Sequence, residues 1–278
     1  MRCLRRWPAC VEVSTSPAAA AQDLAGRGIV ITRPREQAQA LTALVKAAAG
    51  RPIAFPALEI VDAAESRELR TLIDRLDTYH LAVFVSPTAA SRGLNMVRRR
   101  RAWPPGLKAA AVGKGSAREL ERLGVQDVLV PHAGADSEAL LALPELADMR
   151  GRAVIIFRGA GGRELLGTTL RARGATVDYA ECYRRTRPQS DVQALLRAWT
   201  LGEIHAVTVT SGEALRNLFD MLGTLGRHWL RKTPLFVAHE RIAEAARELG
   251  IDAIVVAGAS DEAMLHALFR YFAPPPVE

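Results

Sequence analysis

Six short segments of the sequence place hydroxyl, glycine or cationic residues where an apolar, β-branched run gives way to a helical pattern. Unpaired backbone N–H groups and the positive end of the helix dipole gather at such turns, so these turns are suited to binding anions. One such turn is typical of ordinary helix capping, but six together favour a binding site. The segments contain Thr32 and Arg33; Ser86, Pro87 and Thr88; Gly113, Lys114, Gly115 and Ser116; Arg158, Gly159, Gly162 and Arg163; Thr210, Ser211 and Gly212; and His239 and Arg241.

The overall charge also favours an anionic partner. The 278 residues include 37 lysines and arginines against 30 acidic residues, a formal net charge of +7. Nucleic acid, a membrane surface and a polyanionic small molecule are all partners that fit this charge. The alternative is that the charge only reflects an organism whose proteins are rich in arginine. The arginine run 98–101 has no interleaved aromatic residues and is interpreted as a solvated surface. Since no apolar run approaches the roughly 20 residues of a membrane helix, we expect neither nucleic acid nor membrane as partner.

Several other chemistries lack their sequence signature. The six histidines show no metal-ligand spacing, and no nucleophile-elbow pattern is present. Gly113 and Gly115 do not begin a dinucleotide-binding fingerprint, because Arg118 stands where the third glycine is required. The three cysteines form no disulfide framework. The sequence therefore predicts no metal site, and a protein of the reducing cytoplasm.

The turns have to be positioned by the elements on either side of them. Short apolar runs alternate with helical patterns, and Ala38, Leu41, Val45 and Ala48 are spaced to form one buried helix face. This alternation predicts an α/β fold with parallel sheets covered on both faces. The expected strands are 28–32, 81–85, 109–112, 128–130, 153–157, 206–210, 235–238 and 253–256.

The second half of the chain repeats the order of the first. Ile-Thr-Arg-Pro at 31–34 is answered by Ile-Phe-Arg-Gly at 156–159, Val-Phe-Val-Ser at 83–86 by Val-Thr-Val-Thr at 207–210, and segment 111–117 by 237–243. Gly124 and Gly250 also correspond, each where a helix requires a left-handed cap. A repeat of about 125 residues is a duplicated domain rather than a solenoid unit. Two similar lobes predict a ligand cleft between them.

The repeat leaves two domain arrangements open. Either two continuous domains follow one another, or the chain crosses between lobes at the extended segments 52–60 and 177–184. In the second arrangement lobe 1 consists of residues 28–55 plus 187–272, and lobe 2 of residues 59–180. Residues 1–27 have no apolar stretch of secretory-signal length. We expect them to be a disordered extension or the product of a misplaced start codon, and 273–278 to be a loose tail.

Seven motifs, in order, resemble the uroporphyrinogen-III synthase family. They are Ile-Thr-Arg-Pro-Arg-Glu-Gln-Ala at 31–38, Phe-Pro-Ala-Leu-Glu-Ile at 55–60, Phe-Val-Ser-Pro-Thr-Ala-Ala at 84–90, Ala-Val-Gly-Lys-Gly-Ser-Ala at 111–117, Arg-Gly-Ala-Gly-Gly-Arg-Glu-Leu-Leu at 158–166, Tyr-Ala-Glu-Cys-Tyr-Arg-Arg at 179–185 and Thr-Ser-Gly-Glu-Ala-Leu at 210–215. The resemblance extends from about residue 28 to 268. It implies two Rossmann-like or flavodoxin-like lobes with parallel sheets, joined by a two-stranded connector, and so favours the discontinuous arrangement.

The resemblance also implies a reaction. Members of this family are lyases that work without a cofactor and cyclise the linear tetrapyrrole hydroxymethylbilane to uroporphyrinogen III, with loss of water and inversion of the last pyrrole ring. The eight carboxylates of this substrate are ionised at neutral pH. The six turns supply the N–H donors, hydroxyl groups and positive field that such a substrate requires. The expected protein is a monomer in tetrapyrrole and haem biosynthesis that receives its substrate from hydroxymethylbilane synthase.

Tyr183 is the catalytic residue that the resemblance implies. Its phenol is protonated at neutral pH and would act as a general acid when the substrate hydroxyl leaves; a tyrosine that only packs on the connector is the alternative. The turn His239-Glu240-Arg241-Ile242-Ala243 departs from the family pattern Gly-x-x-Thr-Ala, and Glu240 would repel a carboxylate. This departure keeps open a second function, a two-lobed regulatory module that binds a tetrapyrrole or another anion without turnover.

Overall fold

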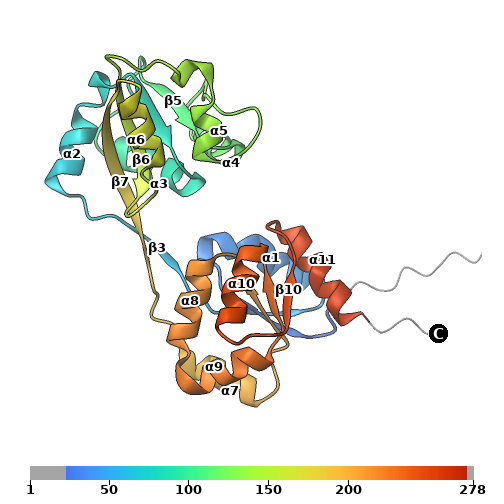
Figure 1. Ribbon diagram of the computed structural model, residues 1–278. Coiled ribbons are helices and arrows are strands. Elements are labelled where there is room, and N and C mark those ends of the chain that lie inside the picture. Colours follow the sequence, from blue (N-terminus) through green and yellow to red (C-terminus); the bar gives the residue numbers. More distant parts are fainter. Residues whose placement is uncertain (1–22, 274–278) are drawn as a thin grey trace, which may run out of the picture. The chain divides into compact units, whose positions relative to one another are not determined.

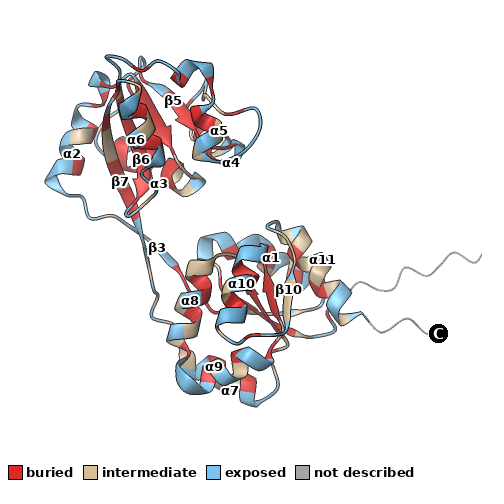
Figure 2. Ribbon diagram, viewed as in Figure 1, coloured by how far each residue is buried: buried red, intermediate tan, exposed pale blue. Residues whose placement is uncertain are grey.

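The computed structural model describes residues 23–273, which fold as two compact α/β units (Figure 1). Unit 1 consists of the chain up to Pro56 together with the chain from Ser190 onward, and unit 2 is the intervening segment Ala57–Gln189. Each unit contains one five-stranded sheet, and the central strands of both sheets are buried, as Figure 2 shows. The expected fold class, two α/β lobes with mostly parallel sheets, is confirmed.

The folded part of unit 1 begins before Gly28. Leu24 is fully buried, and its backbone N–H donates to the carbonyl of Ala48 at 2.7 Å. The expected N-terminal extension therefore does not include residues 23–27. Residues 1–22 of that extension, and residues 274–278 of the expected tail, lie outside the described residues.

Unit 1 is built on a sheet of order β10-β9-β8-β1-β2 in which every pairing is parallel. Ile29 and Ile31 of β1 pack with Leu41 of α1 and Leu268 of α11 in one core. The apolar face predicted for α1 is buried, which confirms the helical spacing. The elements are β1 (Gly28–Ile31), α1 (Arg35–Ala47), β2 (Arg51–Ala54), α7 (Val192–Thr200), β8 (Ala206–Val209), α8 (Gly212–Met221), α9 (Gly223–Lys232), β9 (Leu235–Val237), α10 (Glu240–Glu248), β10 (Ile254–Val256) and α11 (Asp261–Phe272).

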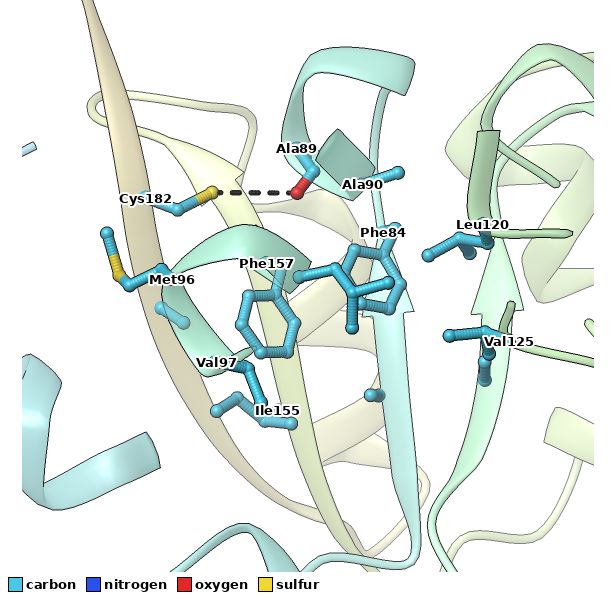
Figure 3. Close-up of a cluster of buried hydrophobic side chains, with 14 of the residues drawn as sticks. Phe84, Ala89, Ala90, Met96, Val97, Leu120, Val125, Ile155, Phe157 and Cys182 are labelled. Atoms are coloured by element: carbon cyan, nitrogen blue, oxygen red, sulfur yellow. Dashed lines mark hydrogen bonds between the residues drawn. The ribbon is translucent and has the colours of Figure 1, made fainter. Parts of the chain in front are cut away.

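Unit 2 has the sheet order β3-β7-β6-β4-β5, in which only the pairing of β3 with β7 is antiparallel. Alternate residues of its central strands enter two cores, because successive strand side chains point to opposite faces. Phe84 and Phe157 lie in one core (Figure 3), whereas Val83 and Ile156 lie in the other. The elements are β3 (Glu59–Asp62), α2 (Arg67–Asp74), η1 (Leu76–Thr78), β4 (Leu81–Phe84), α3 (Pro87–Arg98), β5 (Lys108–Ala111), α4 (Lys114–Arg122), α5 (Ser137–Leu141), η2 (Pro144–Leu146), β6 (Ala153–Gly159), α6 (Leu165–Ala172) and β7 (Thr176–Thr186).

One expected strand is absent and one expected segment is divided. Segment 128–130 contributes only a single parallel bridge, between Leu129 and Ala110, because the chain turns immediately before it at Asp127, which has a φ of 53°. Segment 52–60 consists of the end of β2 and the start of β3, with irregular residues between them. The left-handed caps at Gly124 and Gly250 are confirmed, with φ angles of 81° and 74°.

The internal repeat is present in the structure with one change of register. The sequence match equates Ser86 with Thr210, but the equivalent of Ser86 in the fold is Ser211. Each of these serines is the N-cap of the helix that follows a central strand, and each accepts the backbone N–H three residues on, from Ala89 at 3.0 Å and from Ala214 at 3.1 Å. The match of β-branched residues misplaced this pair by one position.

Two histidines hold equivalent places in the two units. His80 precedes β4 and its Nδ1 accepts the N–H of Ala153 at 3.1 Å; His205 precedes β8 and its Nδ1 accepts the N–H of Gly28 at 3.0 Å. Each histidine therefore pairs the start of its own strand with the start of the neighbouring strand.

Among residues 23–273, no group of three or more His, Cys, Asp or Glu side chains is arranged to hold a metal ion.

The arginine run 98–101 is engaged within unit 2. Arg99, Arg100 and Arg101 form ion pairs with acidic residues of segment 65–77, at N–O distances of 3.4, 2.7 and 2.6 Å, and Arg98 donates to the carbonyl of Leu123. These contacts tie the end of α3 to α2 and α4.

None of the helices in residues 23–273 combines the length and the apolar character needed to cross a membrane.

Candidate active site

The predicted site residues of unit 2 lie at one edge of its sheet. Strands β4, β5, β6 and β7 are parallel neighbours, so the residues that follow β4, β5 and β6 lie at the same edge as the end of β7. Two contacts join them directly. The hydroxyl groups of Ser86 and Tyr183 are 3.3 Å apart, and a Cβ on Gly115 would lie 3.5 Å from Cγ of Pro87. The structure thus brings together the turns that contain Ser86, Gly115 and Arg158, and Tyr183.

Tyr183 is held tightly near the end of β7. Only 3% of the residue is exposed, and its ring lies so close to Gly159 that a Cβ there would be 2.6 Å from Cε2. The backbone carbonyl of Tyr183 accepts the N–H of Ala160 at 2.9 Å. A register shift at the end of β6 places Tyr183, not Cys182, opposite Gly159. The glycine and the register shift together fix the phenol beside Ser86.

Ser86 links this tyrosine to helix α3. The residue is half-buried and caps the helix by accepting the N–H of Ala89 at 3.0 Å. Pro87 occupies the first helical position, where its missing N–H costs nothing. The serine side chain therefore has a fixed orientation at the start of α3.

The turn after β5 divides into buried and exposed residues. Gly113 is buried and caps α4, and a Cβ there would lie 3.0 Å from that of Ala135. Ser116 is only 3% exposed, so its side chain faces the interior. Lys114 is exposed, and no carboxylate within the described part of the chain pairs with it. Lys114 is the cation of this turn that remains open to an anion.

Arg158 is occupied by acidic residues of its own unit. The residue is 7% exposed; its guanidinium lies 2.8 Å from Glu164 and 3.3 Å from Glu181, and 4.0 Å above the ring of Tyr179. The Tyr179 hydroxyl donates to Glu164 at 2.8 Å. This hydrogen bond, and then the bond from Arg158, lower the pKa of the Glu164 carboxyl. Arg158 therefore fastens the loop before α6 to β7, while Arg163 stays exposed.

The predicted site residues of unit 1 follow β1, β8 and β9, three neighbouring parallel strands. Thr32 is fully buried and its hydroxyl donates to the carbonyl of Thr208 at 2.7 Å. Arg33, the repeat equivalent of Arg158, pairs with Asp261 of α11. Arg33 and Arg158, two of the four arginines expected to bind substrate carboxylates, are thus paired with carboxylates of the protein. A third, Arg163, is exposed and lies 3.8 Å from Glu138.

The remaining predicted residues of unit 1 are accessible. Thr210, Ser211 and Gly212 are half-buried. His239 is the exposed N-cap of α10 and makes no side-chain cap bond. Arg241 is exposed, and no ion pair to it is found within residues 23–273. These residues leave hydroxyl and cationic groups available at the starts of α8 and α10.

The unusual Glu240 is neutralised within its own helix. Its carboxylate pairs with Arg247 two turns further along α10, at 2.8 Å. The repulsion expected from Glu240 is therefore reduced by an ion pair that the family comparison of this turn did not reveal.

The acidic partners of the two arginines were missed by the sequence analysis. Glu164 and Glu181 lie within two of the quoted motifs but were given no role there, and Asp261 lies outside all of them. The available signal was physical: an arginine that ends a buried strand requires a counter-charge, because an unpaired buried charge is costly.

Cys182 lies beside Tyr183 as a buried free thiol. Burial raises the pKa of this thiol to about 12, and Sγ donates to the carbonyl of Arg158 at 3.3 Å. Since the thiolate is the reactive form, we expect the folded protein at pH 8 to react with iodoacetamide at least about 100-fold more slowly at Cys182 than the protein unfolded in urea. The measurement uses a Cys3→Ser/Cys10→Ser variant and mass spectrometry. Equal rates in the two states would contradict the burial of this thiol.

The comparisons with known proteins agree with one another. A family model described as "Uroporphyrinogen-III synthase HemD" matches residues 39–266. The uroporphyrinogen-III synthase of Salmonella typhimurium is 39% identical over 246 residues, which cover 86% of this chain and 99% of that protein. The Escherichia coli protein of the same name is 35% identical over 243 residues, with the same coverage.

Solved structures show the same fold. A mutant uroporphyrinogen III synthase from Thermus thermophilus matches with a TM-score of 0.58 at 21% identity, covering 88% of this chain and 98% of that chain. The uroporphyrinogen-III synthetase from Helicobacter pylori matches with a TM-score of 0.56 at 15% identity, covering 88% and 99%. The chain is a member of the uroporphyrinogen-III synthase family.

Proposed function

We propose that this chain is an active uroporphyrinogen-III synthase, a hydro-lyase that cyclises hydroxymethylbilane to uroporphyrinogen III. Membership of the family supports this activity over nearly the whole length of the curated relatives. The observation in the structure that supports it most directly is the Tyr183–Ser86 pair, two hydroxyl groups 3.3 Å apart at the sheet edge of unit 2. A hydroxyl pair at this position can protonate a leaving hydroxyl group without a cofactor.

The carboxylates of the substrate are proposed to bind at the accessible turn residues of each unit. In unit 2 these are Thr88, Lys114, Gly115, Gly162 and Arg163, and in unit 1 they are Thr210, Ser211, Gly212, His239 and Arg241. The first turns of α3, α4, α8 and α10 add backbone N–H groups, which have no partner within the helix. We leave the side chains of Thr32, Ser116, Arg33 and Arg158 out of this set, because internal bonds or burial already engage them.

Loss of the substrate hydroxyl is the step that needs a proton. A hydroxyl group departs from a hydroxymethylpyrrole as water once its oxygen is protonated, because the pyrrole nitrogen supplies the electrons that replace the C–O bond. Closing the ring at the substituted carbon then depends on how the chain of pyrroles is held. Positioning of this kind can lower the activation barrier by several kcal/mol. The many donors of the turns therefore set the course of cyclisation, while the hydroxyl pair starts it.

The setting of this activity is part of the proposal. We propose a cytoplasmic monomer that receives hydroxymethylbilane from hydroxymethylbilane synthase. The free thiol at Cys182 is in keeping with a reducing compartment. If the substrate is received directly, less free hydroxymethylbilane is left to close spontaneously to the type I isomer.

Genetic complementation tests the proposed function in cells. A bacterial strain whose own uroporphyrinogen-III synthase gene is deleted should grow without added haem when it produces this chain. Leu201→Ala, which changes an exposed side chain on the surface of unit 1, serves as a second active form, and the empty vector as the negative control. Absence of growth with folded, abundant protein would contradict the proposal.

A further inference from the structure

We infer that Ser86, and not Tyr183, is the side chain that touches the leaving hydroxyl group and protonates it. Tyr183 donates a hydrogen bond to Ser86 and replaces the proton that Ser86 gives up. This inference rests on the proposed function. It concerns which member of the hydroxyl pair meets the substrate. Three observations carry it: the hydrogen-bond inventory of Ser86, the burial of Tyr183, and the comparison with the equivalent serine of unit 1.

The hydrogen bonds of Ser86 leave one function free. A serine hydroxyl has two acceptor lone pairs and one O–H donor. One lone pair accepts the N–H of Ala89 at 3.0 Å, and the other lies 3.3 Å from the hydroxyl of Tyr183. When Tyr183 donates to Ser86, both lone pairs are occupied, and the Ser86 O–H is the group left to donate to a ligand.

The burial of Tyr183 decides the direction of this hydrogen bond. Tyr183 is 3% exposed, and in the described part of the chain Ser86 is the partner found for its hydroxyl. If Ser86 donated instead, the phenol O–H would be buried without an acceptor, which costs about 1–3 kcal/mol. The lower-energy arrangement is therefore Tyr183 donating to Ser86.

Exposure gives the two residues different roles. Ser86 is half-buried at the edge of the sheet, whereas the Tyr183 ring is enclosed by Gly159 on one side and has the Arg185 guanidinium 6.0 Å from its centroid. A substrate oxygen can approach the serine without moving the tyrosine. Ser86 is then the catalytic residue, and Tyr183 is the residue that orients it and renews its proton.

The duplicated unit shows that this pairing is not a general feature of the cap. Ser211 occupies the equivalent position and accepts the N–H of Ala214. Ala54, at the end of β2, matches Tyr179 of β7 in the strand pairing, so the place equivalent to Tyr183 lies in segment 55–58, Phe-Pro-Ala-Leu, which contains no tyrosine. Both serines cap a helix, and among the contacts found within residues 23–273 only Ser86 has a tyrosine hydroxyl as a partner. The cap bond therefore does not require the tyrosine, which gives Ser86 a hydrogen bond that Ser211 lacks.

The proton transfer balances over the pair. As the C–O bond of the hydroxymethyl group breaks, its electron pair stays on the oxygen, which takes the Ser86 proton and leaves as water. The pyrrole nitrogen lone pair forms the exocyclic double bond of an azafulvenium cation. Tyr183 passes its own proton to Ser86. The cation then gives its N–H proton to Ser86, which returns a proton to Tyr183 along their hydrogen bond. The products are the neutral azafulvene, water and the original hydroxyl pair.

Steady-state kinetics, measured as formation of the type III product, can show which of the two hydroxyl groups contacts the substrate. We expect Ser86→Ala to lower kcat about 100-fold with little change in KM, and Tyr183→Phe to lower it about 10-fold, the effect of one supporting hydrogen bond. The Ser86→Ala/Tyr183→Phe variant should be no slower than Ser86→Ala, because the tyrosine acts through the serine. Ser86→Thr, which keeps the hydroxyl, should stay within about threefold of the wild type.

Loss of the helix cap is controlled by Ser66→Ala. Ser66 caps α2 in the same unit by accepting the N–H of Leu69 at 3.1 Å, so this variant loses an equal cap bond and should keep kcat within about twofold. A larger loss in Tyr183→Phe than in Ser86→Ala, multiplicative losses in the double variant, or a Ser86→Ala variant as active as Ser66→Ala would each overturn the inference. A folded wild-type protein that makes no type III isomer would instead contradict the proposed function.

Discussion

Gly159→Ala is expected to lower kcat about 10-fold, as much as Tyr183→Phe, while the protein remains folded. The added Cβ would lie 2.6 Å from Cε2 and 2.7 Å from Cζ of Tyr183, distances that the ring can relieve only by moving. Movement of the ring takes its hydroxyl away from that of Ser86 (now 3.3 Å), so the variant loses the same supporting hydrogen bond as Tyr183→Phe, an effect of about 10-fold in rate. The overpacking itself costs about 1–3 kcal/mol of stability. Activity and a urea unfolding curve, measured on the same sample, separate the two effects.

Gly106→Ala is the matched control for this substitution. A Cβ at Gly106 meets nothing within 4 Å, and Gly106 is not among the glycines with positive φ. This variant should match the wild type in both activity and stability. Wild-type kcat in folded Gly159→Ala would show that the fixed position of the Tyr183 ring is unimportant, and the account of the site would be wrong.

Phe84→Ala is expected to cause the largest loss of stability, about 3–5 kcal/mol. Phe84 is fully buried in unit 2 and is stacked on Phe157, with ring centroids 4.7 Å apart and planes 7° apart. The ring centroids of Phe84 and Trp103 are 6.0 Å apart. Removing the Phe84 side chain leaves a cavity that the sheet and α3 cannot close, because both cores of unit 2 share the backbone of β4.

Urea unfolding measures this effect. Trp103 packs against the core that contains Phe84. Its fluorescence, recorded with the three other tryptophans (Trp7, Trp199 and Trp229) replaced by phenylalanine, should show a lower unfolding midpoint in Phe84→Ala. Leu165→Ala is the control within the same unit, because Leu165 is 42% exposed, and surface changes usually alter the free energy of unfolding by less than about 0.5 kcal/mol. An unchanged midpoint in Phe84→Ala would contradict the core described for unit 2.

Local patterns predicted the elements that depend on local physics. The spacing of Ala38, Leu41 and Val45 predicted the buried face of α1, because helical periodicity is written in the sequence itself. Gly124 and Gly250 predicted helix ends, since their backbone conformation is one that other residues rarely adopt. The strand expected at 128–130 failed because an apolar run of three residues cannot be distinguished from a bridge in a loop.

Long-range pairing limited the prediction of the site. The turns were correctly recognised as ends of parallel strands, but the partners of Arg33 and Arg158 come from residues 6 to 228 positions away, and no sequence period links them. Tyr183 and Ser86 are 97 residues apart and meet through the pairing of β7, β6 and β4. Their contact depends on a register shift at Gly159, which no sequence pattern indicated.

The isomer composition of the product tests the central claim most directly. Purified full-length protein is supplied with hydroxymethylbilane generated by hydroxymethylbilane synthase, the products are oxidised, and the porphyrin isomers are separated by chromatography. We predict that the type III isomer predominates over the type I isomer formed spontaneously, and that the type III fraction rises with protein concentration. Type I alone, from protein shown to be folded, would contradict the assignment of this chain as an active uroporphyrinogen-III synthase.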